Sequence, residues 1–128
     1  MNIEKFLLVN NIRITKRLDQ HFLLKSEMLE KEVALAELEK NDVVLEIGPG
    51  IGNLTRLLAE KCRVVAIEKD LQFISLIKNI ENVDIIHGDA LEILKTKLKF
   101  NKIVSNIPYS ISQPLLLELL KHSWQKAV

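Results

Sequence analysis

Three glycines at alternate positions, Gly48, Gly50 and Gly52, directly follow a short apolar run, and this spacing is typical of a turn that cradles a ligand. Glycine lets the backbone approach a ligand closely, and a helix that follows such a turn offers free amide groups. A Walker A loop would continue with Lys and Ser or Thr, but the next residue is Asn53. A dinucleotide fingerprint would need its third glycine at position 53, one residue later than it occurs.

Acidic residues near this turn favour a cofactor without phosphates. Glu46 precedes the turn, where it would repel a pyrophosphate and attract the sulfonium and ammonium groups of S-adenosylmethionine. Glu68 ends the next expected strand, a position from which a carboxylate accepts both ribose hydroxyls, although a lone glutamate there is more often a surface charge. Asp89 ends the third strand and either accepts from the adenine amino group or caps the next helix, and both roles are compatible.

Residues 105–109, Ser-Asn-Ile-Pro-Tyr, follow a fourth expected strand and suit methyl transfer to an aromatic amine. The lone pair of such a nitrogen is delocalised into the ring, and a site that accepts both N–H bonds outside the ring plane turns the lone pair toward the methyl donor. Asn106 offers a side-chain carbonyl, and Pro108 restricts the carbonyl of Ile107. Tyr109 offers a flat face on which a base can stack.

No general base is needed for this transfer, because the nitrogen is neutral, the leaving group is an uncharged thioether and the product proton is acidic. Positioning and electrostatics would then supply the rate. The alternative is a simple strand-ending turn, in which Asn, Pro and Tyr are common. The position downstream of a glycine turn favours the chemical interpretation.

Apolar runs that suit buried strands alternate with helical patterns along the chain. Strands are predicted over 43–47, 63–67, 83–87 and 102–105, and helices over 26–40, 53–61, 71–79, 90–97 and 112–122. Ser26 and Ser112 are the predicted N-caps of the first and last helices. The pattern indicates an α/β fold, a sheet of about four parallel strands with flanking helices. Together with the glycine turn and its acidic neighbours, this sheet is interpreted as a Rossmann-like class I methyltransferase sheet.

The sequence after the last helix, 125–128, resembles the run-up to a fifth strand. A four-stranded sheet would leave its fourth strand as an unprotected edge, so we expect a truncated chain or half of a larger unit. Residues 1–25 are interpreted as a basic segment, and residues 26–128 as the partial methyltransferase domain.

Bulk composition is ordinary for a globular protein of 128 residues, with 48% hydrophobic and 27% charged residues. The net charge of +1 gives no case for nucleic-acid binding by the chain as a whole. The single cysteine, Cys62, is expected to pack in the core, and the absence of a possible intrachain disulfide points to a reducing, cytoplasmic location. No membrane span, signal peptide or metal site is predicted.

The chain resembles the ribosomal RNA adenine dimethyltransferases, which modify adjacent adenosines near the 3′ end of small-subunit RNA during ribosome biogenesis. The resemblance covers nearly all residues from 16 to 128 and has an archaeal rather than a bacterial look. It depends on five segments in the family's order and spacing: 16–23, 46–55, 67–70, 88–91 and 106–109.

The resemblance implies roles for individual residues. Segment 1–25 would close over the cofactor. The cofactor-binding residues would be His21 and Leu23 at the methionine end, Gly48 and Gly50 in the turn, Glu68 at the ribose, Asp89 at the adenine, and Asn106. Asn106 would also bind the target amine, and Tyr109 would stack on the flipped adenine. Family members continue into further strands and a small helical RNA-binding domain, which this chain does not show.

Three functions compete on the sequence alone. The first is N6 dimethylation of adenosines in small-subunit ribosomal RNA, with a pre-30S-type particle as the partner. The second is a catalytically incomplete module that binds cofactor or RNA and needs a complementing C-terminal chain or fragment. The third, a nicotinamide-dependent oxidoreductase, is disfavoured by the glycine spacing. Arg13, Lys16 and Arg17 are candidates for RNA phosphate contacts, although such clusters are often only solvated surface.

Overall fold

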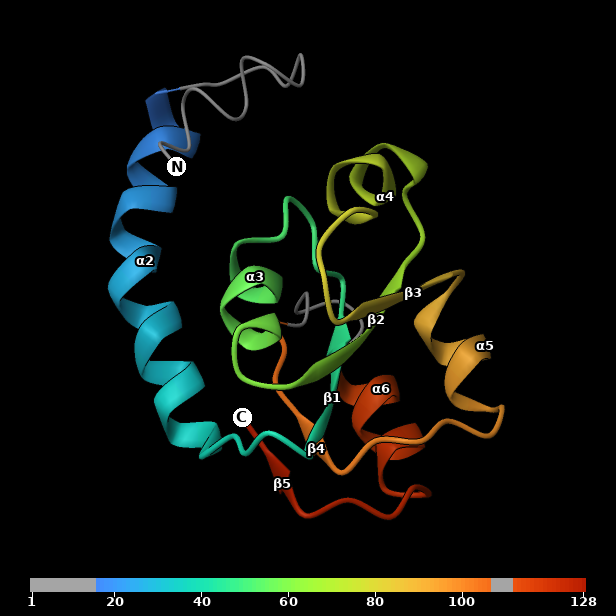
Figure 1. Cartoon of the computed structure of the whole chain (residues 1–128). Helices are drawn as coiled ribbons and strands as arrows, with labels where there is room; N and C mark the ends of the chain where they lie inside the picture. Colours follow the sequence, from blue (N-terminus) through green and yellow to red (C-terminus); the bar gives the residue numbers. More distant parts are fainter. Residues whose placement is uncertain (1–15, 107–111) are drawn as a thin grey trace.

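A computed structural model describes the backbone of residues 16–106 and 112–128, and the side chains of residues 26–106 and 113–128. Within these residues, parallel strands form one sheet in the order β3-β2-β1-β4-β5, with helices on both faces (Figure 1). The strands are β1 (Val43–Ile47), β2 (Arg63–Glu68), β3 (Val83–His87), β4 (Lys102–Ile103) and β5 (Lys126–Ala127). The helices are α2 (Lys16–Ala36), α3 (Asn53–Ala59), α4 (Leu71–Ile77), α5 (Ala90–Leu94) and α6 (Ser112–Leu119).

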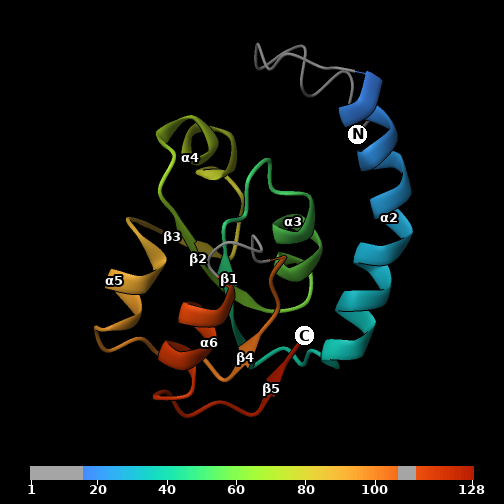
Figure 2. The ribbon, with the colours of Figure 1, turned by 180° about the vertical axis from the view of Figure 1, so that it is seen from behind.

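The two faces of the sheet build two separate cores, because successive side chains of a strand point to opposite faces. Val44, Val64 and Ala66 belong to a buried cluster with apolar side chains of α2 and α3. Leu45 and Ile67 belong to a second cluster with side chains of α5 and α6. Figures 1 and 2 show α2 and α3 on one side of the sheet and α5 and α6 on the other. The predicted fold class is therefore confirmed.

The first helix differs from its prediction. It runs from Lys16 to Ala36, so the prediction that Ser26 is its N-cap is wrong, and Ser26 lies inside the helix. No glycine or proline interrupts residues 16–36, and strong helix formers fill this stretch. The helix ends before Glu37, which adopts a positive φ of 50°, and not near the predicted Lys40.

Within the described residues the sheet has a fifth strand besides the four predicted ranges, and it lies in residues 125–128, where the sequence suggested the run-up to one. β5 pairs in parallel with β4. The amide of Gln125 donates to Asn101 O at 2.7 Å, and that of Val128 donates to Ile103 O at 2.7 Å. β4 is therefore an interior strand and not the unprotected edge that the sequence suggested.

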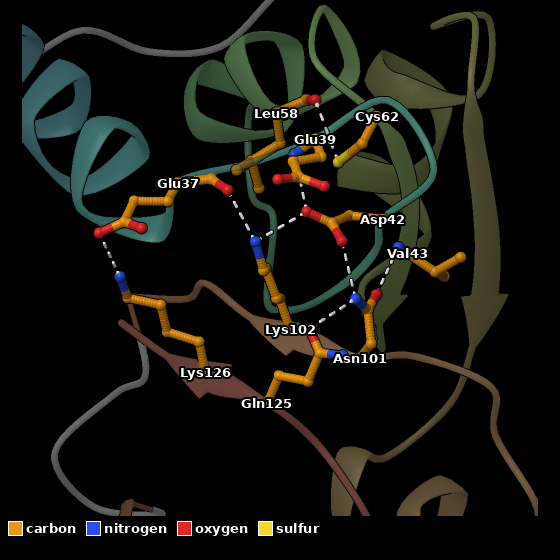
Figure 3. Close-up of polar contacts among 10 residues, drawn as sticks. All are labelled: Glu37, Glu39, Asp42, Val43, Leu58, Cys62, Asn101, Lys102, Gln125 and Lys126. Atoms are coloured by element: carbon orange, nitrogen blue, oxygen red, sulfur yellow. Dashed lines mark hydrogen bonds and ion pairs between the residues drawn. The ribbon is translucent and has the colours of Figure 1, made fainter.

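Polar side chains hold the start of β4 at the start of β1. They supplement the backbone pairing of these two strands, which covers only two residue pairs. The Asn101 side chain accepts from Val43 N at 2.7 Å and donates to Asp42 Oδ1 at 2.7 Å (Figure 3). Lys102 Nζ lies 2.8 Å from Asp42 Oδ2 and donates to Glu37 O at 2.7 Å. We call Asp42, Asn101 and Lys102 the polar clasp.

The ion pair of the polar clasp is buried, with each side chain only 10% exposed. Burial by itself raises the pKa of Asp42, but the hydrogen bonds and positive charge of its partners, Lys102 first, outweigh that effect and hold the pKa below its usual value. The Asp42 carboxylate therefore stays charged in the folded protein at neutral pH, and it compensates the ammonium group of Lys102.

Cys62 is buried as predicted, and burial raises the pKa of its thiol to about 11, so the thiol is not a nucleophile at neutral pH. In the described part of the chain, no helix is both long and apolar enough to cross a membrane.

Replacement of Asp42 by Ala should lower the free energy of unfolding by about 3 kcal/mol, because it leaves a buried ammonium group without its counter-charge. Urea unfolding of both proteins would measure this loss. The control is Asp84→Ala, which breaks an exposed pair with Arg63 and should cost less than about 1 kcal/mol. An equal loss in the two variants would contradict the role assigned to the polar clasp.

Candidate active site

The glycine turn leaves the carboxyl end of β1 and enters α3 (Figure 1). Gly48 and Gly50 have φ values of +68° and +58°, which side chains rarely permit, and a Cβ atom on either would meet nothing within 4 Å. Gly52 differs, because a Cβ atom there would lie 2.7 Å from both Arg56 Nη1 and Ile77 Cγ2. The turn is therefore open to a ligand at Gly48 and Gly50 and closed by packing at Gly52.

Ser105 brings the end of β4 to this turn. Its hydroxyl donates to Ile47 O at 2.7 Å and accepts from Ile47 N at 3.1 Å. These two bonds extend the β1–β4 register, in which Leu45 pairs with Ile103, by two residues. In this register Asn106 follows β4 at the level at which Gly48 follows β1.

A pocket of about 250 Å³ lies over the turn. Gly48, Gly50 and Asn106 line it together, with Leu29 of α2 and Phe73 of α4 on its other sides. Leu29 and Phe73 were not among the predicted site residues, because no local motif distinguishes them from other apolar residues of their helices. The structure therefore gathers part of the predicted site in one cavity.

Glu68 holds the turn from the neighbouring strand. Its Oε1 accepts from Gly50 N at 3.2 Å, and its Oε2 accepts from the amides of Lys69 and Asp70 at 2.9 and 3.0 Å. A carboxylate has about four acceptor sites, so these bonds leave capacity for ribose hydroxyls. Glu68 is 7% exposed, and its ribose-binding role stays a prediction.

Asp89 caps α5, which confirms one of its two predicted roles. Its Oδ1 accepts from Leu91 N at 2.9 Å and from Glu92 N at 3.4 Å. Among the described residues no donor bonds to Oδ2, which leaves that oxygen for a ligand. Asp89 and Glu68 do not line the pocket over the turn; they continue the same edge of the sheet, since β3 pairs with β2 and β2 with β1.

Glu46 is a buried acid at the pocket, with only 2% of its surface exposed. Thr55 Oγ1 donates to Glu46 Oε2 at 2.6 Å. Burial, and to a lesser extent the negative charge of Glu68, raise the pKa of Glu46 to about 7 against the opposing effect of the Thr55 hydrogen bond. The sequence indicated an acid beside the turn but not its burial or its Thr55 partner.

Several predicted site residues cannot be placed from the structure. Arg13 and Tyr109 lie outside the described residues, as does the carbonyl of Ile107. His21 and Leu23 lie on the N-terminal half of α2, as do Lys16 and Arg17, where only the backbone is described. Within residues 26–106 and 113–128, no group of three His, Cys, Asp or Glu side chains could hold a metal ion.

Comparison with known proteins decides the family. The family model described as ribosomal RNA adenine dimethylase matches residues 11–128. The chain belongs to the ribosomal RNA adenine dimethylase family. The range that matches this dimethylase family includes the glycine turn, the ends of β2 and β3, and Asn106.

Relatives of this dimethylase-family chain carry matching names. Proteins named probable ribosomal RNA small subunit methyltransferase A are 43% identical over 122 residues in Thermococcus sibiricus and 45% identical over 127 residues in Pyrococcus furiosus. The matches cover 92% and 96% of this chain but only 44% and 46% of those archaeal proteins. The chain therefore spans less than half the length of these relatives.

A solved structure agrees with the dimethylase fold. The crystal structure of a dimethyladenosine transferase from Plasmodium falciparum matches with a TM-score of 0.71 and 34% sequence identity. It covers 79% of this chain and 39% of that protein. The sheet described above is therefore the methyltransferase sheet predicted from the strand and helix pattern.

Replacement of Glu46 by Gln should change how stability depends on pH. The pKa of this carboxyl rises from 4.5 in the unfolded chain to about 7 in the fold, so its protonated form stabilises the fold fully below pH 4.5, and this contribution is lost as the pH rises through 7. Relative to wild type, the Gln variant should gain about 3 kcal/mol between these limits, as urea unfolding across the pH range would measure.

The companion variant is Thr55→Val, which removes the hydrogen bond that lowers the pKa of Glu46. In this variant the pKa of Glu46 should rise further, so the loss of stability with rising pH should extend to higher pH than in wild type. A pH-independent difference between wild type and Glu46→Gln would contradict the raised pKa.

Proposed function

We propose that this chain binds S-adenosylmethionine and carries the methyl-transfer site for N6 dimethylation of adenosines in small-subunit ribosomal RNA. One observation carries the proposal: the candidate groups follow the carboxyl ends of four adjacent strands. Asp89 follows β3, Glu68 ends β2, Gly48 follows β1 and Asn106 follows β4. Ligands of open parallel sheets bind along this edge. The family match and the names of the relatives support the same function.

The residues present fit this cofactor. Open space over Gly48 and Gly50 admits a ligand against the backbone, and the acidic neighbours Glu46 and Glu68 suit a cation and oppose a pyrophosphate. When bound, S-adenosylmethionine supplies an electrophilic methyl group on a sulfonium. Glu68 would accept the ribose hydroxyls, and the free Oδ2 of Asp89 would accept from the adenine amino group. His21 and Leu23 are proposed to close over the methionine end.

Asn106 is proposed to orient the target amine. Its exposed side chain lies at the same pocket as Gly48, so a carbonyl that accepts an N–H of adenine would stand near the methyl donor. The Ile107 carbonyl would accept the second N–H, and Tyr109 would stack on the base after it leaves its helix, offsetting part of the unstacking cost. Arg13, Lys16 and Arg17 are proposed to contact RNA phosphates.

Titration calorimetry with S-adenosylmethionine tests the cofactor assignment. Asp89→Asn should bind about tenfold more weakly than wild type, because Asn still caps α5 but loses a charged acceptor for the adenine amine. The matched control is Asp70→Asn, which makes the same change at the N-cap of α4, where the carboxylate accepts from Gln72 N at 2.8 Å. The control should bind like wild type.

The same assay separates this cofactor from a nicotinamide nucleotide. S-adenosylmethionine should raise the melting temperature, whereas NAD should not. Absence of S-adenosylmethionine binding, or equal stabilisation by NAD, would overturn the proposal.

Transfer of labelled methyl groups to small-subunit RNA tests the role of Asn106. Asn106→Ala should reduce the rate by about a hundredfold or more, because an oriented hydrogen-bond acceptor is lost at the reacting amine. Its free energy of unfolding should change by less than about 0.5 kcal/mol, since the side chain is exposed.

The exposed Asn79, in the turn after α4, provides the control variant Asn79→Ala, which should retain the wild-type rate. A wild-type rate in Asn106→Ala would refute the assigned role. Transfer seen only after addition of the remaining part of a relative's sequence would favour the alternative of a module that needs a complementing chain.

A further inference from the structure

A second concave surface lies away from the glycine turn. A groove of about 600 Å³ is lined by residues 94–99, from the end of α5 into the loop before β4, and by residues 118 and 121–123 at the end of α6. Both segments lie near the amino end of β4, whereas the glycine turn follows the carboxyl end of the parallel strand β1. We call this surface the lysine groove.

The lining of the lysine groove is strongly basic. Four lysines, Lys95, Lys97, Lys99 and Lys121, face one glutamate, Glu118. The whole chain carries a net charge of only +1, so positive charge is concentrated in this groove and the remainder of the chain is net negative. A segregated positive surface attracts polyanions.

Burial alternates along the loop before β4, and this directs its lysines to solvent. Leu98 packs against the core between the sheet, α5 and α6, and Phe100 is buried in that core. Lys97 and Lys99, the residues beside Leu98, are exposed. In the described part of the chain, neither lysine makes an ion pair or a side-chain hydrogen bond, so both ammonium groups are available to a ligand.

The other two lysines have only weak partners. Lys95, which follows α5, pairs with Glu92 of α5 at 3.2 Å, and Lys121, which follows α6, pairs with Glu118 of α6 at 3.1 Å. Exposed pairs of this type contribute little and are screened by salt. A phosphate can therefore compete for both ammonium groups.

The walls of the groove are held in place without a ligand. His122 Nε2 donates to Leu94 O at 2.6 Å and joins the end of α6 to the end of α5. The rings of His122 and Phe100 pack with centroids 5.4 Å apart. Trp124 Nε1 donates to Leu119 O at 2.8 Å. The groove thus exists in the folded chain and does not have to form on binding.

We propose that the lysine groove binds the phosphate backbone of RNA at a distance from the methylated base; this rests on the proposed function, which makes RNA the substrate. Lysine is a compact point charge that suits phosphates, and phosphate contacts position a nucleic acid without reading its bases, so the groove would position RNA and not select its sequence. α6 extends from the segment after Asn106 to the groove, about 12 Å along its axis. An RNA that presents an adenine at Asn106 can therefore reach both places.

The salt dependence of RNA binding tests the proposal. Fluorescence anisotropy with a short labelled RNA hairpin would compare wild type with Lys97→Gln/Lys99→Gln. Each lost phosphate contact removes about 0.7 to 0.9 from the slope of log affinity against log salt, so the double variant should lose about 1.5. Its affinity near physiological salt should fall by about tenfold, and Lys97→Arg/Lys99→Arg should keep the wild-type slope.

The matched control is Lys61→Gln/Lys78→Gln, which removes two exposed lysines outside the groove and gives the same net charge. An equal fall of the slope in both double variants, an unchanged slope in Lys97→Gln/Lys99→Gln, or salt-independent RNA binding by wild type would overturn the proposal. Calorimetry with S-adenosylmethionine separates the two hypotheses. If the cofactor does not bind but the slopes differ as expected, the proposed function fails and the groove stands.

Discussion

The paired hydrogen bonds between the Ser105 hydroxyl and the backbone of Ile47 fix the register on which the candidate site depends. Backbone pairing between β1 and β4 covers only two residue pairs, so it specifies their alignment weakly. Ser105 secures the carboxyl end, and the polar clasp of Asp42 and its partners secures the amino end. A slip by one residue would carry Asn106 about 3.3 Å along the sheet and reverse the side to which it points.

The buried Glu46 destabilises the fold locally, and the packing of the rest of the sheet offsets this cost. Glu46 places a carboxyl in the interior with one hydroxyl partner, where ionisation opposes folding. The same strand, β1, pairs with β2 over its full length, and its apolar neighbours fill both cores. A buried acid with a perturbed pKa beside a cavity is typical of functional sites. Stability and ligand chemistry are thus carried by neighbouring residues of one strand.

The sequence predicted the sheet well where a strand pattern ends at a clear turn signal. The strands at 43–47 and 83–87 have the predicted bounds, and the glycine turn separates β1 from α3 as expected. Ser26 failed as a helix start because a serine inside a helix looks the same as a cap when only local signals are read. The pairing of β5 with β4, the Ser105 bonds and the hydrogen bond from Gly50 to Glu68 depend on contacts between distant segments, which no local pattern contains.

The three glycines of the turn face different constraints, and this affects how related sequences should be interpreted. A methyl group at position 52 would collide with the side chains of Arg56 and Ile77 whether or not the protein used a cofactor. At positions 48 and 50 the neighbouring space is empty, and only the backbone angles and an incoming ligand oppose a larger residue. In a descendant that abandoned methyl transfer, only the backbone angles would still favour glycine at positions 48 and 50, whereas the packing constraint at position 52 would remain in full.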